Sequence, residues 1–184
     1  MDWIDQFESC NGPPIDCRQV PAEVIERYQS AFPSRLIQLW REAGWCGYRG
    51  GLIWIINPEE YAVPLKTWFA RGPAPIAFAR TAFCDLFLWN GSNVLLLDPV
   101  TGHLEPTGPK VELFLGHALC DPDYLEDVCG SADFEPVVKR LGRPSFDECF
   151  GFMPPPGLGG ADELENLKRL KADVYLSICG QAMR

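Results

Sequence analysis

Apolar residues recur at three- and four-residue spacing in several stretches of the chain, which is the period of an amphipathic helix. In the first third of the chain this spacing predicts a helix over 21–32, with a proline in its first turn. A second helix is predicted over 34–43, capped by Ser34 and ended by Gly44. A third helix is predicted over 58–69, because a proline and two glutamates suit a first turn.

Strands are predicted where apolar residues alternate with other residues between turn-forming glycines and prolines. Five such stretches are found: 52–56, 76–81, 83–89, 94–98 and 103–105. Gly47, Gly50 and Gly51 permit a tight turn before the first of them. Asn90-Gly91 is a strong hairpin signal, and Thr101-Gly102 predicts a second turn. The pattern therefore predicts an antiparallel meander.

The pattern becomes helical again from Pro109. Three helices are predicted there: 111–119, 124–128 and 134–141. Gly142 should end the third of them. Residues 146–160 are rich in proline and glycine and predict an ordered loop, after which a last helix should begin near Asp162.

Neither an internal repeat nor a linker divides the 184 residues, a length that suits one domain. We therefore predict a single globular α+β domain, in which an antiparallel meander is packed with helices. Residues 1–108 would form the α+β region, and 109–184 would form a helical C-terminal half packed on it.

The net charge of −9 narrows the choice of partner. Binding of nucleic acid needs clustered Lys and Arg, and an anionic membrane surface also attracts basic segments, so neither is expected as a direct partner. A basic protein is a better match, because complementary potentials raise the rate of encounter. Solubility alone is the alternative explanation of the charge.

The N-terminal residues are acidic and lack the basic and apolar regions of a secretory signal. No apolar run approaches the roughly 18–20 residues that span a bilayer. We therefore expect a cytoplasmic protein. Its eight cysteines, with no Cys-x-x-Cys spacing, are expected to be mostly buried free thiols in a reducing compartment.

A nucleophilic pair of Cys84 with His103 or His117 is possible on residue types alone. No local signature accompanies these residues. We therefore predict a protein that is not an enzyme and has no catalytic residues.

Two further motifs could hold a ligand, and each lacks an essential part. The carboxylates between Asp121 and Asp127 lack the glycine and the alternating ligands of a calcium loop. The glycines at 157–160 precede a predicted helix, but neither a strand before them nor a Lys-Ser or Lys-Thr pair after them completes a phosphate loop. We therefore predict no metal and no cofactor.

Six acidic residues lie between positions 121 and 136, without any Lys or Arg: Asp121, Asp123, Glu126, Asp127, Asp133 and Glu135. Like charges at this density suit either a solvated face or contact with a basic partner. Trp45 and Tyr48 lie in the glycine-rich segment, where they could be exposed interface anchors or core residues. These eight residues are the predicted partner-binding set.

Several blocks carry a resemblance to a known family: LWREAGWCGY at 39–48, GLIWIINPEEY at 51–61, IAFARTAFCDLFLW at 76–89 and FDECFGFMP at 146–154. Together they resemble the GAD-like immunity proteins that bacteria carry beside type VI secreted toxins, with 1–108 as the GAD-like region. The family pattern has Gly at the position of Cys84, which suits a small residue better than a nucleophile.

The resemblance implies an antitoxin that binds a secreted toxin, typically a DNase, and blocks it inside the producing cell. It supplies no catalytic residues. A basic nuclease as the cognate toxin would agree with the acidic charge. Two alternatives are an accessory binding protein in nucleic-acid metabolism, since the GAD name comes from tRNA-charging enzymes, and a Cys-dependent enzyme.

Overall fold

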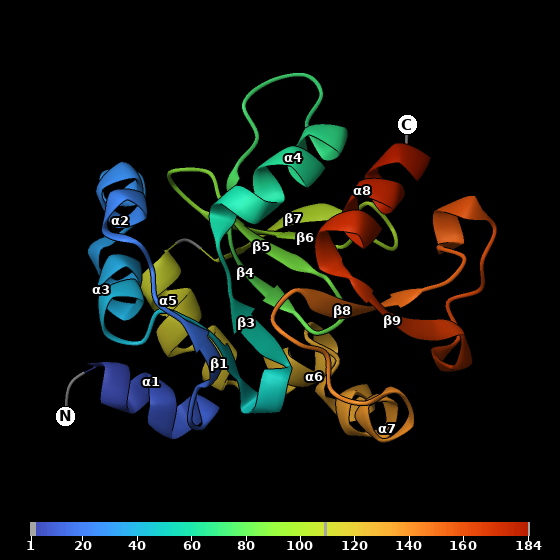
Figure 1. The fold of residues 1–184 in the computed structure, drawn as a ribbon, viewed down its shortest axis with the longest axis horizontal. Helices are drawn as coiled ribbons and strands as arrows, with labels where there is room; N and C mark the ends of the chain where they lie inside the picture. The colour runs from blue at the N-terminus through green and yellow to red at the C-terminus, as the bar shows by residue number, and fades with distance from the viewer. Residues whose placement is uncertain (1–2, 109, 184) are drawn as a thin grey trace.

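The computed structural model describes residues 3–108 and 110–183, which are arranged as an α+β fold (Figure 1). Pro109, where the helical pattern is predicted to begin, lies outside the described residues. Seven strands form one antiparallel sheet in chain order, so each strand pairs with the next along the sequence. The predicted α+β class and antiparallel meander are confirmed.

The strands of this sheet are β1 (Ile15–Arg18), β2 (Trp45–Tyr48), β3 (Ile53–Ile55), β4 (Ile76–Thr81), β5 (Leu86–Trp89), β6 (Val94–Leu97) and β7 (Leu104–Gly108). The five predicted strands are present, with ends that differ by at most three residues. β1 and β2 were not predicted, because β1 is short and largely exposed and β2 lies in the glycine-rich segment. The predicted hairpin at Asn90-Gly91 joins β5 to β6, and Gly91 has a φ of 93°.

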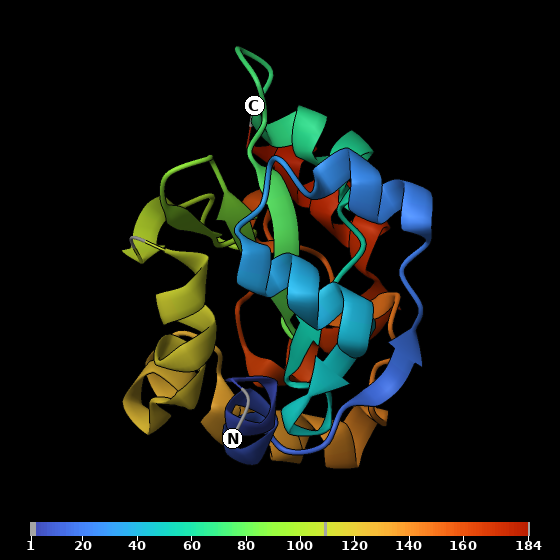
Figure 2. The ribbon, with the colours of Figure 1, turned by 90° about the vertical axis from the view of Figure 1, so that its left-hand side faces the viewer.

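Eight helices are present in the described part of the chain: α1 (Trp3–Asn11), α2 (Ala22–Tyr28), α3 (Ser34–Glu42), α4 (Pro58–Trp68), α5 (Val111–Gly116), α6 (Pro122–Asp127), α7 (Ser131–Leu141) and α8 (Ala172–Ala182). Short 3₁₀ turns accompany them: η1 (Arg49–Gly51), η2 (Ala118–Cys120), η3 (Pro156–Leu158) and η4 (Leu164–Asn166). Figures 1 and 2 show helices on both sides of the sheet.

The alternation of side chains along β4 and β5 assigns these helices to faces. Arg80 pairs with Leu86 in the sheet and contacts Tyr61 of α4, whereas the next residue of β5, Phe87, packs on Phe114 of α5 with ring centroids 4.5 Å apart. α4 and α5 therefore cover opposite faces. α8 lies beside α4, where the Trp68 indole donates to the carbonyl of Leu176 at 3.1 Å, a residue of α8.

Several helix boundaries differ from the prediction. The predicted Ser34 cap is wrong: Pro33 is the N-cap of α3 and makes no side-chain capping hydrogen bond, and Ser34 is the first residue of the helix. Proline before a helix fixes the extended entry conformation without a side-chain cap. The predicted helix over 111–119 is interrupted at His117, directly after Gly116, a poor helix former. Gly44 ends α3 as predicted, with a φ of 86°.

The C-terminal region contains a two-stranded antiparallel sheet that was not predicted, β8 (Glu148–Phe152) and β9 (Leu167–Lys171). The expected loop over 146–160 is thus partly a strand, and the expected helix from Asp162 begins only at Ala172. Leucines at 164, 167 and 170 have helical spacing, but pairing of β9 with β8 overrides that local preference. The C-terminal half is therefore helical with a strand pair inserted.

A fully buried arginine joins this region to the main sheet. Arg80 Nη2 donates to the carbonyls of Phe146 and Glu148, each at 2.7 Å, and Nε donates to the Tyr61 hydroxyl at 3.0 Å. Its guanidinium also lies 5.3 Å from the centre of the Trp54 ring. A buried charge is tolerated only when it is hydrogen-bonded, so Arg80 and the backbone of β8 depend on each other.

Candidate partner-binding face

α6 places the first group of predicted acids at the surface. Asp121 is its N-cap: the carboxylate accepts a hydrogen bond from the Asp123 amide at 3.0 Å, and Pro122 starts the helix. Leu125 is buried and holds the helix against the core. Asp123, Glu126 and Asp127 then project as exposed side chains around the rest of the short helix.

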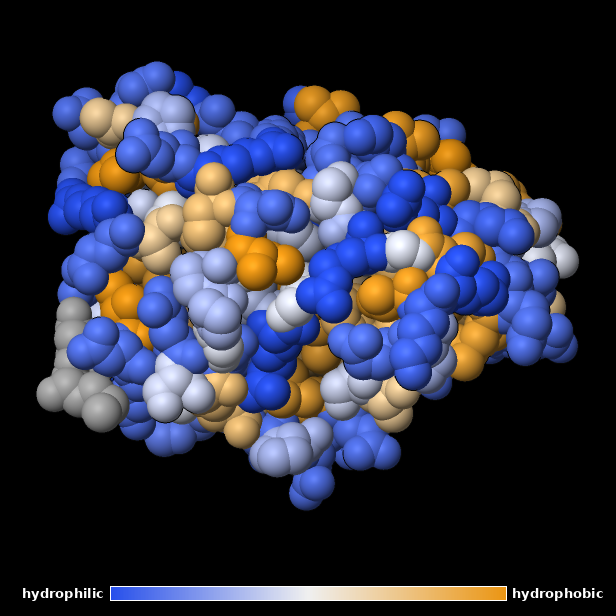
Figure 3. Space-filling model, turned by 60° about the horizontal axis from the view of Figure 1, so that its bottom comes forward, coloured by the Kyte–Doolittle hydropathy of each residue, from blue (hydrophilic) through white to orange (hydrophobic). Residues whose placement is uncertain are grey.

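The second group lies on the first turns of α7, which contacts α6. Asp133 and Glu135 are exposed, on either side of the buried Phe134. Figure 3 brings this end of the molecule forward and shows hydrophilic residues around small apolar patches. The structure therefore brings the six predicted acids to one end of the fold.

These acids are not all uncompensated, as the sequence had suggested. Arg143 lies 3.8 Å from the Glu135 carboxylate, and Asp121 is engaged in capping. Four acids have neither a basic ion-pair partner nor a capping hydrogen bond among the described residues: Asp123, Glu126, Asp127 and Asp133. We call these four residues the acidic face.

Of the two alternatives for Trp45 and Tyr48, the structure shows core residues and rules out exposed partner-binding anchors. Both belong to β2, with exposed fractions of 5% and 0%. Trp45 packs edge-on against Trp40, and Tyr48 packs edge-on against Phe7 of α1 at 4.9 Å between ring centroids. Gly47 between them lies under Trp54, so this glycine permits close packing of neighbouring strands rather than an exposed turn.

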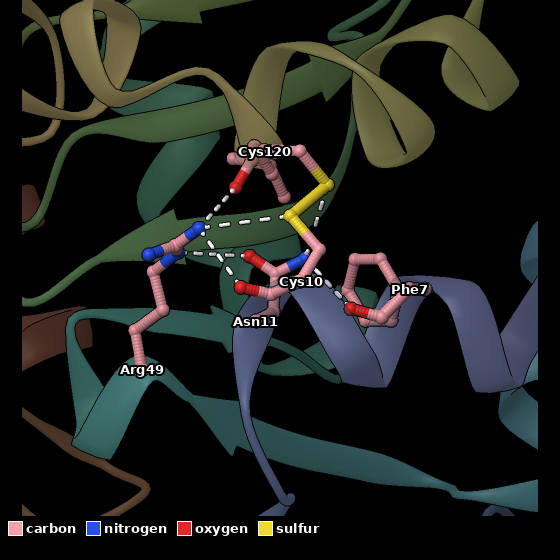
Figure 4. Close-up of a disulfide and its surroundings, with 6 residues drawn as sticks. Phe7, Cys10, Asn11, Arg49 and Cys120 are labelled. Atoms are coloured by element: carbon pink, nitrogen blue, oxygen red, sulfur yellow. Dashed lines mark hydrogen bonds between the residues drawn. A yellow bond between two sulfur atoms is a disulfide. The ribbon is translucent and has the colours of Figure 1, made fainter.

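A disulfide not foreseen from the sequence lies beside this end of the fold (Figure 4). It joins Cys10, near the end of α1, to Cys120, directly before the N-cap of α6, with Cα atoms 5.6 Å apart. Arg49 lies against it: Nη2 donates to the carbonyls of Cys10 at 3.1 Å and Leu119 at 3.2 Å, and Nε donates to the Asn11 side chain at 3.0 Å.

A second disulfide, Cys17–Cys46, joins β1 to β2. The expectation of free thiols is thus wrong for four cysteines, because pairing depends on which segments fold side by side rather than on spacing in the sequence. The other four are free and buried as expected: Cys84, Cys129, Cys149 and Cys179. Burial raises the pKa of the Cys129 thiol to about 12.

Cys84 does not have the surroundings of a nucleophile. It is fully buried, its sulfur lies 3.6 Å from the Ala172 carbonyl, and a hydrogen bond with Cys149 together with burial raises its pKa well above the usual value. A reactive cysteine needs the opposite shift. His103 and His117 are exposed, and His103 lies 3.2 Å from Glu105.

In the described part of the chain, no three or more His, Cys, Asp or Glu side chains gather closely enough to hold a metal ion. An apolar hollow of about 520 Å³ lies between the segment after α2, the segment after α4 and the β5–β6 turn, and no titratable side chain lines it. It therefore offers no acid or base for catalysis.

Comparison with protein families assigns both parts of the chain. Residues 2–98 match the GAD-like domain, and residues 110–183 match the C-terminal domain of T6SS immunity protein Tdi1. The chain belongs to the GAD-like type VI secretion immunity proteins. A comparison with curated proteins gives no significant match.

The fold of this immunity protein is also that of a solved structure, the crystal structure of Atu4351 from Agrobacterium tumefaciens. The two share 20% sequence identity and a TM-score of 0.82, over 96% of this chain and 88% of the other. At this identity the similarity concerns the fold.

The two family regions are interlocked in the immunity protein. Cys10 lies in the first region and Cys120 in the second, so one disulfide connects them, and Arg80 connects them again through hydrogen bonds. Among the residues described, no helix has the length and apolar character needed to cross a membrane.

Proposed function

We propose that this immunity protein binds its cognate toxin one-to-one, without turnover, and that the toxin is a DNase acting in the cytoplasm. The observation that carries the proposal is the acidic face, whose exposed carboxylates lack ion-pair partners among the described residues. Membership of the immunity family supports toxin binding as such.

Charge explains why a DNase is the favoured partner. An enzyme that binds DNA presents Lys and Arg to the phosphates, so its substrate surface is basic. Carboxylates on α6 and α7 would occupy the places of phosphates on that surface and exclude DNA. The attraction would also raise the rate of association, which matters in a cell that makes its own toxin.

The local structure suits this role. Leu125 and Phe134 are buried, so α6 and α7 are held to the core while their acids remain exposed. The Asp121 cap and Pro122 fix the start of α6. Little side-chain or backbone ordering would then be needed on binding.

The test is charge reversal with a matched control. The variant Asp123→Lys/Glu126→Lys/Asp127→Lys changes the net charge by the same amount as Asp162→Lys/Glu163→Lys/Glu165→Lys, whose exposed acids lie elsewhere in sequence. We expect the first variant to slow association with the toxin by about tenfold or more and to reduce its salt dependence. The control should lose much less.

Co-expression with the toxin supplies the biological readout: the first variant should protect cells poorly and the control should protect them. Both should keep the thermal midpoint, because surface substitutions usually change stability by less than about 0.5 kcal/mol. Equal association rates for the two variants would show that the acidic face is only a solvated surface. A toxin that leaves DNA intact would overturn the assignment of a DNase.

A further inference from the structure

The two disulfides differ in what surrounds their sulfur atoms. The Cys10 sulfur lies 3.7 Å from Nη2 of Arg49, a cation. The sulfurs of the other disulfide face carbonyl oxygens instead: Cys46 lies 3.0 Å from the carbonyl of Ala43, and Cys17 lies 3.9 Å from that of Ile15. A neighbouring guanidinium stabilises a thiolate, whereas a neighbouring carbonyl dipole does not.

Hydrogen bonds hold the Arg49 guanidinium beside the Cys10 sulfur. Besides the carbonyls of Cys10 and Leu119 it binds the side-chain oxygen of Asn11, a residue only 1% exposed. Among the described residues no carboxylate forms an ion pair with Arg49, so its charge remains available to the sulfur. Cys10 and Cys120 are each half-buried and Cys17 is exposed, so a small thiol can approach both disulfides and access does not distinguish them.

The disulfides also differ in what they hold together. Cys17–Cys46 joins strands that are already paired in the sheet. Cys10–Cys120 joins segments 110 residues apart, and it attaches α1 to the turn that leads into α6. Noncovalent contacts of α1 with the rest of the fold remain when this bond opens, including the ring contact of Phe7 with Tyr48. Reduction of Cys10–Cys120 therefore removes one cross-link between α1 and the turn before α6 and leaves the protein folded.

We propose that Cys10–Cys120 is a thiol–disulfide exchange site for a small thiol of the glutathione class, and that Cys17–Cys46 is a structural bond. Disulfides persist poorly where such thiols are abundant, so the bond with the better leaving sulfur opens first.

The exchange is balanced with two small thiols. The thiolate of the first attacks the Cys120 sulfur, the S–S bond breaks, and Cys10 leaves as a thiolate beside Arg49. The thiolate of the second attacks the sulfur of the small molecule in the mixed disulfide and releases Cys120. Two small thiols become one small disulfide, and their two protons and two electrons reduce the protein disulfide to two thiols.

The experiment uses the full chain alone, so its outcome is independent of the proposed toxin. Protein is equilibrated in glutathione buffers of graded redox ratio, free thiols are alkylated, and the labelled cysteines are identified by mass spectrometry. We expect Cys10 and Cys120 to be half-reduced at a [GSH]²/[GSSG] ratio at least about tenfold lower than Cys17 and Cys46. Simultaneous reduction of the two disulfides would overturn the proposal.

Variants at Arg49 test the cause. Arg49→Gln keeps a hydrogen-bond donor without the charge and should bring the two midpoints together, whereas Arg49→Lys should preserve much of the difference. An unchanged difference in a folded Arg49→Gln protein would overturn the role of the cation.

A second measurement covers the case in which Arg49→Gln does not fold. In Cys120→Ser, the alkylation rate of Cys10 should rise with pH. The midpoint of this pH profile should lie below the ordinary cysteine pKa of about 8.5. In Cys46→Ser, Cys17 is the matched control and should titrate at or above that value. A Cys10 midpoint at or above about 8.5 would contradict the proposal.

Discussion

Arg80 and Arg49 both hold distant segments together through hydrogen bonds to backbone carbonyls, but in different surroundings. Each arginine donates to two backbone carbonyls through Nη2: Phe146 and Glu148 for Arg80, Cys10 and Leu119 for Arg49. Arg80 is fully buried, and water cannot replace any of its hydrogen bonds. Arg49 is half-buried and lies beside an openable disulfide. Arg80 therefore makes a permanent connection between its segments, whereas the connection at Arg49 includes a disulfide that can open.

The largest difference should follow removal of each guanidinium. Arg80→Met removes the donor of hydrogen bonds to three backbone carbonyls and to a tyrosine hydroxyl, and we expect a loss of about 3–5 kcal/mol in the free energy of unfolding. Arg49→Met should lose about 1–2 kcal/mol, because water can reach part of this site. Urea unfolding at unchanged m-value measures both losses. Similar losses would show that burial does not distinguish the two arginines.

Removal of each disulfide tests how much the connection beside Arg49 contributes to stability. In oxidised protein, Cys10→Ser/Cys120→Ser and Cys17→Ser/Cys46→Ser should each lose about 2–4 kcal/mol. Sequence separations of 110 and 29 residues predict that the first pair loses about 1 kcal/mol more, through the unfolded state.

The same double variants provide their own control under reducing conditions. Fully reduced wild-type protein should then match them closely in thermal midpoint. A reduced wild type that stays much more stable than both variants would show that the serines act through packing rather than through the lost cross-link.

The sequence predicts the seven-stranded sheet well and the β8–β9 strand pair poorly, for a physical reason. Strands such as β4 and β5 carry their own alternation and turn signals, so local pattern is sufficient to find them. β9 reads Leu-Lys-Arg-Leu-Lys, which suits a helix equally well, and only its pairing with β8 decides. Long-range pairing of this kind leaves no local trace.

The candidate site shows the same limit. The acids of α6 could be found because a run of like charges is visible in the sequence, but the pairing of Glu135 with Arg143 could not. Trp45 and Tyr48 were misplaced because glycines that permit close packing look the same as glycines of an exposed turn. The Cys10–Cys120 bond depends on α1 folding against η2.

A pH-dependent effect is expected next to Arg80, in the β4–β5 turn. Burial raises the pKa of the Asp85 carboxyl to about 7, with Asp98 adding to the rise and the Thr81 hydroxyl, at 2.6 Å, opposing it. The native state therefore binds the proton of the Asp85 carboxyl more tightly than the unfolded chain does. Its stabilising contribution is complete below about pH 4 and is lost as the pH rises through about 7.

Asp85→Asn isolates this contribution. The variant should be more stable than the wild type by about 1–3 kcal/mol at pH 8 and similar to it at pH 4, as measured by urea unfolding at each pH. Asp133→Asn, on the acidic face, is the matched control for a carboxyl-to-amide change at an exposed position. A constant difference between Asp85→Asn and the wild type at both pH values would contradict the prediction.

The smallest effect is expected at Cys84, beside Arg80 in the same turn. Cys84 has a φ of 77°, in the left-handed region where glycine is favoured. Cys84→Gly should relieve about 1 kcal/mol of backbone strain and lose a similar amount of buried apolar contact, so stability should change by less than about 1 kcal/mol. Cys84→Ala is the comparison variant, because it loses the sulfur without relieving the backbone. Since the sulfur is buried and its thiol pKa is raised, both variants should still protect cells from the toxin. A stably folded Cys84→Gly or Cys84→Ala protein without protection would contradict binding without turnover and point to a role for this thiol.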